Sequence, residues 1–133
     1  MPTREIKQGD IILAKIITGD WPSGLAFYSH DGDFIQAGTW SYQSGKELLA
    51  HTHNNVPRDS NKTQEVVFVR KGKLAARIYD MDKQLIERVE LNAGDMLIAL
   101  HGGHGYDILE DDTQVLEVKN GPYPGPERDR TRF

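Results

Sequence analysis

The sequence contains no cysteine among its 133 residues. Disulfides and thiolate ligands are therefore excluded, and any bound metal must be held by nitrogen and oxygen atoms. Long apolar runs are also missing, since none approaches the ~20 residues that a membrane-spanning helix needs. Residues 1–7 lack the apolar segment of a signal peptide. We therefore expect a cytoplasmic protein with no membrane partner.

The chain also lacks an excess of positive charge. Its 16 Lys and Arg stand against 20 Asp and Glu, which gives a net charge of -4 at pH 7. The basic residues are scattered rather than gathered into a stripe, so we expect no nucleic-acid partner. A hydrophobic content of 38% and a length of 133 residues indicate one globular domain rather than a disordered chain.

No strong helical periodicity is present. The apolar runs are short, rich in β-branched or aromatic residues and interrupted by Gly, Asp, Asn or Pro, which is typical of an all-β sandwich or barrel. We predict one antiparallel β-barrel domain over residues 1–120, and a Pro/Gly-rich charged tail over residues 121–133. The predicted strands are 11–17, 25–29, 34–40, 47–53, 63–70, 73–79, 85–91, 96–100, 104–109 and 114–118.

Four of the five histidines fall in two short segments, residues 50–53 and 100–104. Residues two apart in a strand point to the same face, so His51 and His53 would present both imidazoles to one point at metal-bonding distance. Taken alone, such a pair on a strand is more often a surface or hydrogen-bonded pair than a metal site.

Glu65 begins the strongly apolar segment 65–69. Its face continues through Val67 and Val69, where an unpaired carboxylate would be costly and a bound cation would remove that cost. The simpler alternative is a strand-end carboxylate that faces water.

Together these residues resemble the two sequence motifs of the cupin superfamily, over residues 45–118. The first motif is present as Gly45, His51, His53, Glu65 and Gly72, and the second as the segment 94–104, which ends at His104. The resemblance implies a jelly-roll β-barrel in which His51, His53, Glu65 and His104 bind one divalent transition metal. Three imidazoles and a carboxylate suit Zn, Fe, Mn, Ni or Cu without choosing among them.

Three features depart from the cupin pattern. Eleven residues separate His53 from Glu65, so residues 54–64 form an insertion. The second motif is one residue short, with Leu100 in place of its usual proline, and Ile108 replaces its last asparagine. His104 therefore has a second interpretation, as a hydrogen-bonded residue of the pocket.

Further candidates surround the predicted site. Tyr106 lies two residues beyond His104, and either exchanges a proton or packs with its hydroxyl satisfied. His101 is a candidate general base or a solvated turn residue. Arg58 and Lys62 lie in the insertion, where they either bind an anionic substrate group or are simply exposed. Trp40 either packs in the core or forms a stacking wall for a sugar or a base.

The resemblance implies a metal-dependent isomerase or epimerase that acts on a small polar substrate, such as a sugar derivative in carbohydrate metabolism. An Fe(II)-dependent dioxygenase is one alternative, and a non-catalytic cupin that binds and senses a metabolite is another. We also expect a homodimer, because cupins commonly pair through outer strands and residues 11–13 are apolar.

Overall fold

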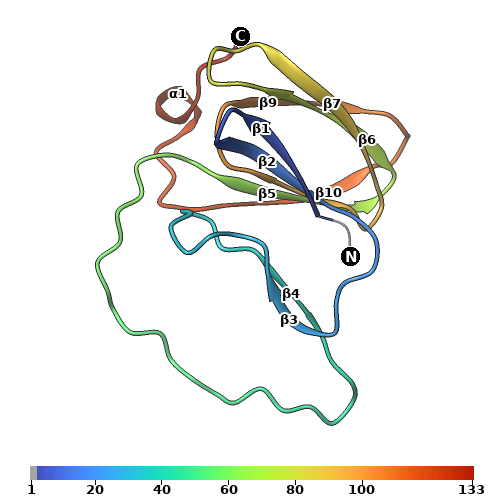
Figure 1. The fold of residues 1–133 in the computed structure, drawn as a ribbon, viewed down its shortest axis with the longest axis vertical. Helices are drawn as coiled ribbons and strands as arrows, with labels where there is room; N and C mark the ends of the chain where they lie inside the picture. The colour runs from blue at the N-terminus through green and yellow to red at the C-terminus, as the bar shows by residue number, and fades with distance from the viewer. Residues whose placement is uncertain (1–2) are drawn as a thin grey trace.

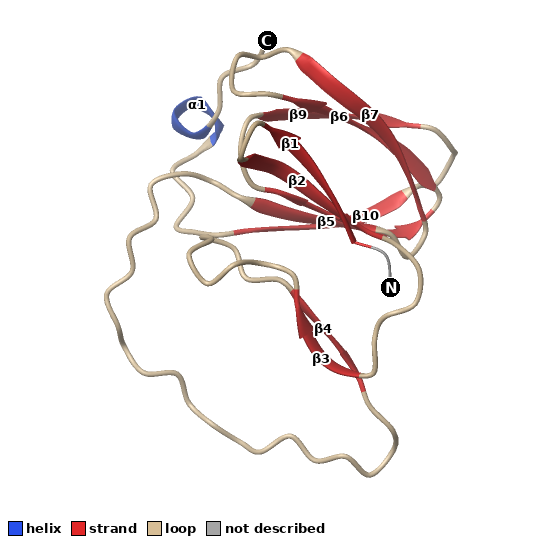
Figure 2. Ribbon diagram, viewed as in Figure 1, coloured by secondary structure: helices blue, strands red, loops and turns tan. Residues whose placement is uncertain are grey.

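The computed structural model describes residues 3–133 and consists almost entirely of β-strands (Figures 1 and 2). Among these residues, no helix is both long and apolar enough to cross a membrane. In chain order the elements are β1 (Thr3–Gln8), β2 (Ile11–Ile17), β3 (Gly24–Phe27), β4 (Gly38–Ser41), β5 (Glu65–Lys71), β6 (Lys73–Tyr79), β7 (Leu85–Asn92), β8 (Met96–Ala99), β9 (Gly103–Ile108), β10 (Gln114–Lys119) and α1 (Pro126–Asp129).

The strands form three antiparallel sheets. The largest has the order β1-β2-β8-β5-β10, the second is β7-β6-β9, and β3 and β4 form a separate hairpin. The prediction of an all-β, antiparallel fold is confirmed. The sheets are not closed into a barrel, because within residues 3–133 no ladder of hydrogen bonds joins one sheet to the next. The arrangement is compatible with a sandwich or a jelly roll.

The main hydrophobic core lies between the two larger sheets. Alternate residues of β6 point inward, and Leu74, Ala76 and Ile78 are each at most 2% exposed. They pack with inward-facing residues of β5 and β8, including Val67 and Leu97. Burying each Leu or Ile side chain contributes roughly 1.5–3 kcal/mol, so this interior holds the sheets together.

The five-stranded sheet is also covered on its outer face near β2 and β8. A second cluster joins Ile17, Met96 and Ile98 to Ile35 and Ala37, which lie in the connection between β3 and β4. Covering both faces explains why every residue of β8 is buried rather than every second one. The hairpin β3–β4 itself extends below the sandwich (Figure 1).

Two predictions of local structure are wrong. Residues 47–53 form no strand. They belong to a long exposed loop, residues 42–63, that extends away from the sheets (Figure 1). A strand needs a neighbour to satisfy its backbone groups, and none lies beside this segment. β1 was missed because Arg4, Glu5 and Lys7 give it a polar sequence. It forms as an edge strand, in which only Ile6 is buried against the core.

Candidate functional site

Glu65 is the first residue of β5, and it faces the interior of the sandwich. It is 4% exposed and shares its face with Val67 and Val69, as the alternation of the sequence predicts. An isolated carboxylate in such a position would be strongly unfavourable. Its stability therefore depends on the polar groups that contact it.

Two side chains of β9 satisfy Glu65 from the opposite sheet. His104 Nε2 lies 2.9 Å from Glu65 Oε1, and the Tyr106 hydroxyl donates a hydrogen bond of 3.1 Å to the same oxygen. His104 and Tyr106 are two residues apart, so they share one face of β9, and their rings are 5.5 Å apart. The three residues thus connect the two larger sheets.

These contacts fix the protonation of Glu65 and Tyr106. Burial raises the pKa of Glu65, but the hydrogen bond and charge of His104, with hydrogen bonds to Glu117 and Tyr106, outweigh it and lower the pKa to about 2. Burial and the neighbouring Glu65 charge raise the pKa of Tyr106 far above its usual range. At neutral pH, Glu65 is therefore ionised and Tyr106 keeps its proton.

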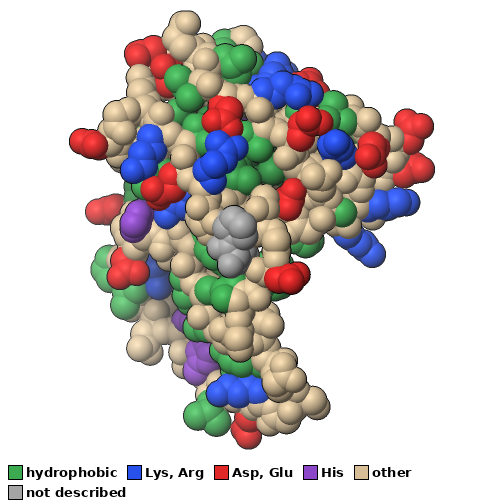
Figure 3. Space-filling view, turned by 45° about the vertical axis from the view of Figure 1, so that its right-hand side comes forward, with side chains coloured by type: hydrophobic (Ala, Val, Ile, Leu, Met, Phe, Trp, Pro, Cys, Tyr) green, Lys and Arg blue, Asp and Glu red, His purple; other side chains and the backbone are tan. Residues whose placement is uncertain are grey.

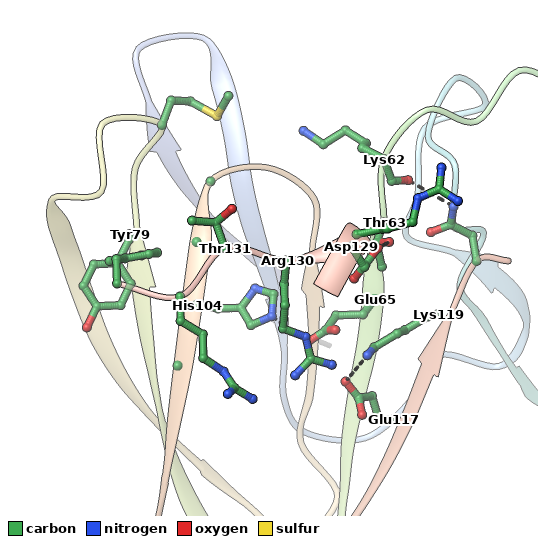
Figure 4. Close-up of a pocket in the computed structure, with 18 of the residues that line it drawn as sticks. Lys62, Thr63, Glu65, Tyr79, His104, Glu117, Lys119, Asp129, Arg130 and Thr131 are labelled. Carbon is green, nitrogen blue, oxygen red and sulfur yellow. Dashed lines mark hydrogen bonds and ion pairs between the residues drawn. The ribbon is translucent and has the colours of Figure 1, made fainter. Parts of the chain in front are cut away.

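Glu65, His104 and Tyr106 line an open cavity of about 1040 Å³ at one end of the sandwich (Figure 4). β6 contributes Arg77, and β10 contributes Glu117 and Lys119. The Arg77 guanidinium lies over Gly105, the residue opposite it on β9, where any side chain would meet it. The cavity thus combines a buried carboxylate, in contact with a more exposed histidine, with several cations.

The C-terminal tail, residues 121–133, forms one wall of this cavity. The Phe133 ring packs edge-on against Tyr79, with the ring centres 5.0 Å apart, and also covers Gly103. Asp129 accepts a hydrogen bond from the hydroxyl of Thr63, two residues before β5. The tail is therefore held at both sides of the opening, and it brings its arginines to the cavity.

His51 and His53 are not brought to this site. Both lie in the exposed loop 42–63 and neither lines the cavity, although their rings are adjacent, with centres 4.9 Å apart. Within residues 3–133, no three His, Asp or Glu side chains are grouped so that they could hold a metal ion. The arrangement of this chain does not fit the four-ligand metal centre, and metal binding stays a prediction.

The other predicted residues are spread over the molecule. Lys62 lines the cavity, and its ammonium lies 2.8 Å from Nδ1 of His101, which borders a different, smaller hollow. Burial and the Lys62 charge lower the pKa of His101. Arg58 is exposed in the loop 42–63, and Trp40 is 61% exposed on β4 rather than packed in the core.

Among the cavity residues that were not predicted, four carry charge that the functional argument uses: Arg77, Glu117, Lys119 and Arg130. The only signal for Arg77 was a glycine beside His104, since glycine inside a strand often allows another group to approach closely. Glu117 and Lys119 share a strand face, but the face becomes significant only once β10 pairs with β5. Arg130 depends on the path of the tail, which no local pattern specifies.

Comparison of the chain with protein-family models, curated proteins and solved structures gave no match. The functional argument therefore depends on the geometry of the cavity.

Proposed function

We propose that the protein is an enzyme that moves a proton on a small polar molecule bound in the cavity, in an isomerisation. The observation that carries this proposal is the contact between His104 and the buried, ionised Glu65. A carboxylate on one imidazole nitrogen orients the ring and supports protonation of the other nitrogen, and this prepares a histidine for general acid–base catalysis.

In the proposed reaction, His104 Nδ1 accepts a proton from a carbon next to a substrate carbonyl group. The same nitrogen then returns the proton to the former carbonyl carbon, while the proton of the hydroxyl on the first carbon passes to the former carbonyl oxygen. The carbonyl and the hydroxyl thereby exchange places, with no external oxidant. Positive charge from Arg77 and Lys119, which line the same cavity, stabilises the enediolate oxygen that forms.

Tyr106 has a positioning role in this scheme. Its hydroxyl already donates to Glu65, and its raised pKa makes it a poor acid toward a substrate. Burial of the ring and the bond to Glu65 hold the carboxylate toward His104. We therefore assign the proton transfer to His104 rather than to Tyr106.

Solvent deuterium exchange tests the proposal. Sugars, sugar phosphates and hydroxy acids are incubated with the protein in D₂O, and deuterium at the carbon next to the carbonyl is measured by NMR. We expect incorporation for at least one compound and a loss of roughly 100-fold in His104→Gln. His30→Gln, a histidine outside the cavity, is the matched control. No incorporation for any compound, or equal rates in both variants, would contradict the proposal.

Membership of the cupin superfamily, with a bound metal, is a second proposal. It is favoured by the contact of Glu65 with His104, two of the four residues that the motifs name. It requires the loop 42–63 to bring His51 and His53 to that pair. Elemental analysis of untagged protein should then find about one Zn, Fe, Mn or Ni per chain, and little in the double variant His51→Ala/His53→Ala. Equal metal content in both proteins would refute it.

A further inference from the structure

Basic side chains are concentrated in the cavity. Seven of the chain's 16 Lys and Arg line it, compared with four of the 20 Asp and Glu. The cavity is thus a positively charged region in a protein whose net charge is -4. A concave region with an excess of one charge attracts ligands of the opposite charge.

Arg130 is a cavity arginine without an ion pair to a carboxylate among residues 3–133. Figure 4 shows its side chain extending from the tail toward the space beside Glu65 and Lys119. The one polar contact of this side chain within residues 3–133 is a long hydrogen bond, 3.4 Å, to the Tyr123 hydroxyl, so no carboxylate neutralises the guanidinium there. Arg77 Nε lies 3.2 Å from Asp107, but its N–H is not aimed for a hydrogen bond.

The tail holds Arg130 in this position from both directions. Asp129, the residue before Arg130, accepts a hydrogen bond from Thr63. Phe133, three residues after Arg130, packs against Tyr79. Two anchors on either side of an arginine reduce the entropy that it loses when a ligand binds.

We propose that the C-terminal tail is part of the binding site, and that Arg130, with Arg77 and Lys119, binds the phosphate group of a small phosphorylated molecule. A guanidinium matches phosphate oxygens in a two-bond geometry, and the excess of three positive charges in the lining suits a group that carries about two negative charges. This inference rests on the proposed function only in making the phosphorylated molecule a substrate, since binding itself is measured without turnover.

Isothermal titration calorimetry of the full chain with glucose, gluconate and glucose 6-phosphate tests the inference. We expect glucose 6-phosphate to bind at least about 10-fold more tightly than the other two. The affinity of Arg130→Gln for glucose 6-phosphate should be about 10-fold lower, with no change for the other two ligands. Phe133→Ala, which removes an anchor of the tail but no charge, should also lower the affinity for glucose 6-phosphate. Arg70→Gln is the matched control, because Arg70 is an exposed arginine outside the cavity.

Equal affinity for the three ligands overturns the inference, as does an equal loss in Arg130→Gln and Arg70→Gln. If Phe133→Ala binds glucose 6-phosphate as tightly as the wild type, the tail does not position Arg130 for binding. The proposed function fails separately: selective phosphate binding without any deuterium incorporation would retain the binding site and remove the enzyme. Deuterium incorporation without any preference for the phosphorylated ligand would retain the enzyme and remove the phosphate-binding site.

Discussion

At the scale of single residues, Glu65 is the side chain whose environment is most unusual. It is an acid at the edge of an apolar interior, and the cost of its burial is offset by His104 and Tyr106, which bind one of its oxygens. The same two contacts prepare a histidine for proton transfer. Stability and chemistry are therefore linked through one carboxylate.

The pKa of Glu65 predicts how stability depends on pH. The group titrates at about 2 in the folded chain, below its ordinary value of 4.5, so the folded state binds the proton more weakly than the unfolded state does. Its contribution is fully present above pH 4.5 and is lost as the pH falls toward 2. The loss is on the order of 3 kcal/mol.

Urea unfolding at pH 7, 4 and 3 measures the part of this loss that occurs above pH 3. In Glu65→Gln, the part of the pH dependence that falls between pH 4.5 and 2 should be much smaller than in the wild type. Glu110→Gln, a change at an exposed turn, serves as the control and should keep the wild-type slope. A Glu65→Gln profile parallel to that of the wild type would show that the carboxylate is not held by these partners.

At the scale of elements, the turn between β5 and β6 depends on Gly72. Its φ of 84° lies in the left-handed region, and a Cβ there would approach the Thr113 Cα to 2.8 Å. Thr113 in turn bonds the backbone of Lys73 and Glu110, so it cannot withdraw without breaking these bonds.

Gly72→Ala should therefore destabilise the fold by about 2–4 kcal/mol, through backbone strain and displacement of Thr113. Gly9→Ala is the matched comparison, because Gly9 also has a positive φ, 57°, but has open space around it. It should cost only about 1–2 kcal/mol. Denaturant unfolding of both variants compares the two costs, and equal values would contradict the steric part of the argument.

The loop 42–63 has little contact with the rest of the molecule. It has no regular secondary structure, and residues 42–61 are all exposed. Backbone that makes so few contacts opens at little cost in free energy and is readily cleaved.

Brief digestion with trypsin should therefore cut first after Lys46 or Arg58, before any lysine or arginine within the strands. Mass spectrometry of the first fragments identifies the sites. First cuts at strand positions, with the loop intact, would show that this segment is protected, as it would be if it closed over Glu65 with His51 and His53.

At the scale of the whole molecule, one face of the hairpin β3–β4 lacks cover. Leu25 and Trp40 are cross-strand partners and are 53% and 61% exposed, and Phe27 on the same strand is 60% exposed. Elsewhere, acidic and basic side chains are intermingled over the upper part of the molecule in the view of Figure 3. A contiguous apolar face of this kind is typical of a protein–protein interface.

We predict a homodimer formed through this face. In light scattering at micromolar concentration, the wild type should have twice the mass of one chain, and Trp40→Lys should be monomeric because a charge cannot be buried there without a partner. Ile108→Lys, at an apolar residue that is 64% exposed on β9, is the control and should remain dimeric. A monomeric wild type would refute the prediction.

The features of this protein that depend on local pattern could be predicted from its residues alone. Alternating apolar residues specified most of the strands, including β6 with the bounds 73–79 that the structure has, and placed Glu65 on the face of Val67 and Val69 and His104 beside Tyr106. A period of two residues fixes which side chains share a face, whatever the partner strand.

Which faces meet depends on the packing of the two larger sheets and the tail. The contact of Glu65 with His104 joins two sheets, and Arg77, Lys119 and Arg130 reach one cavity from β6, β10 and the tail. Their separations along the chain carry no periodic signal. The same limit explains His51 and His53: residues 47–53 were predicted to be a strand, but a strand forms only where another strand satisfies its hydrogen bonds. The position of that neighbour is a property of the whole fold.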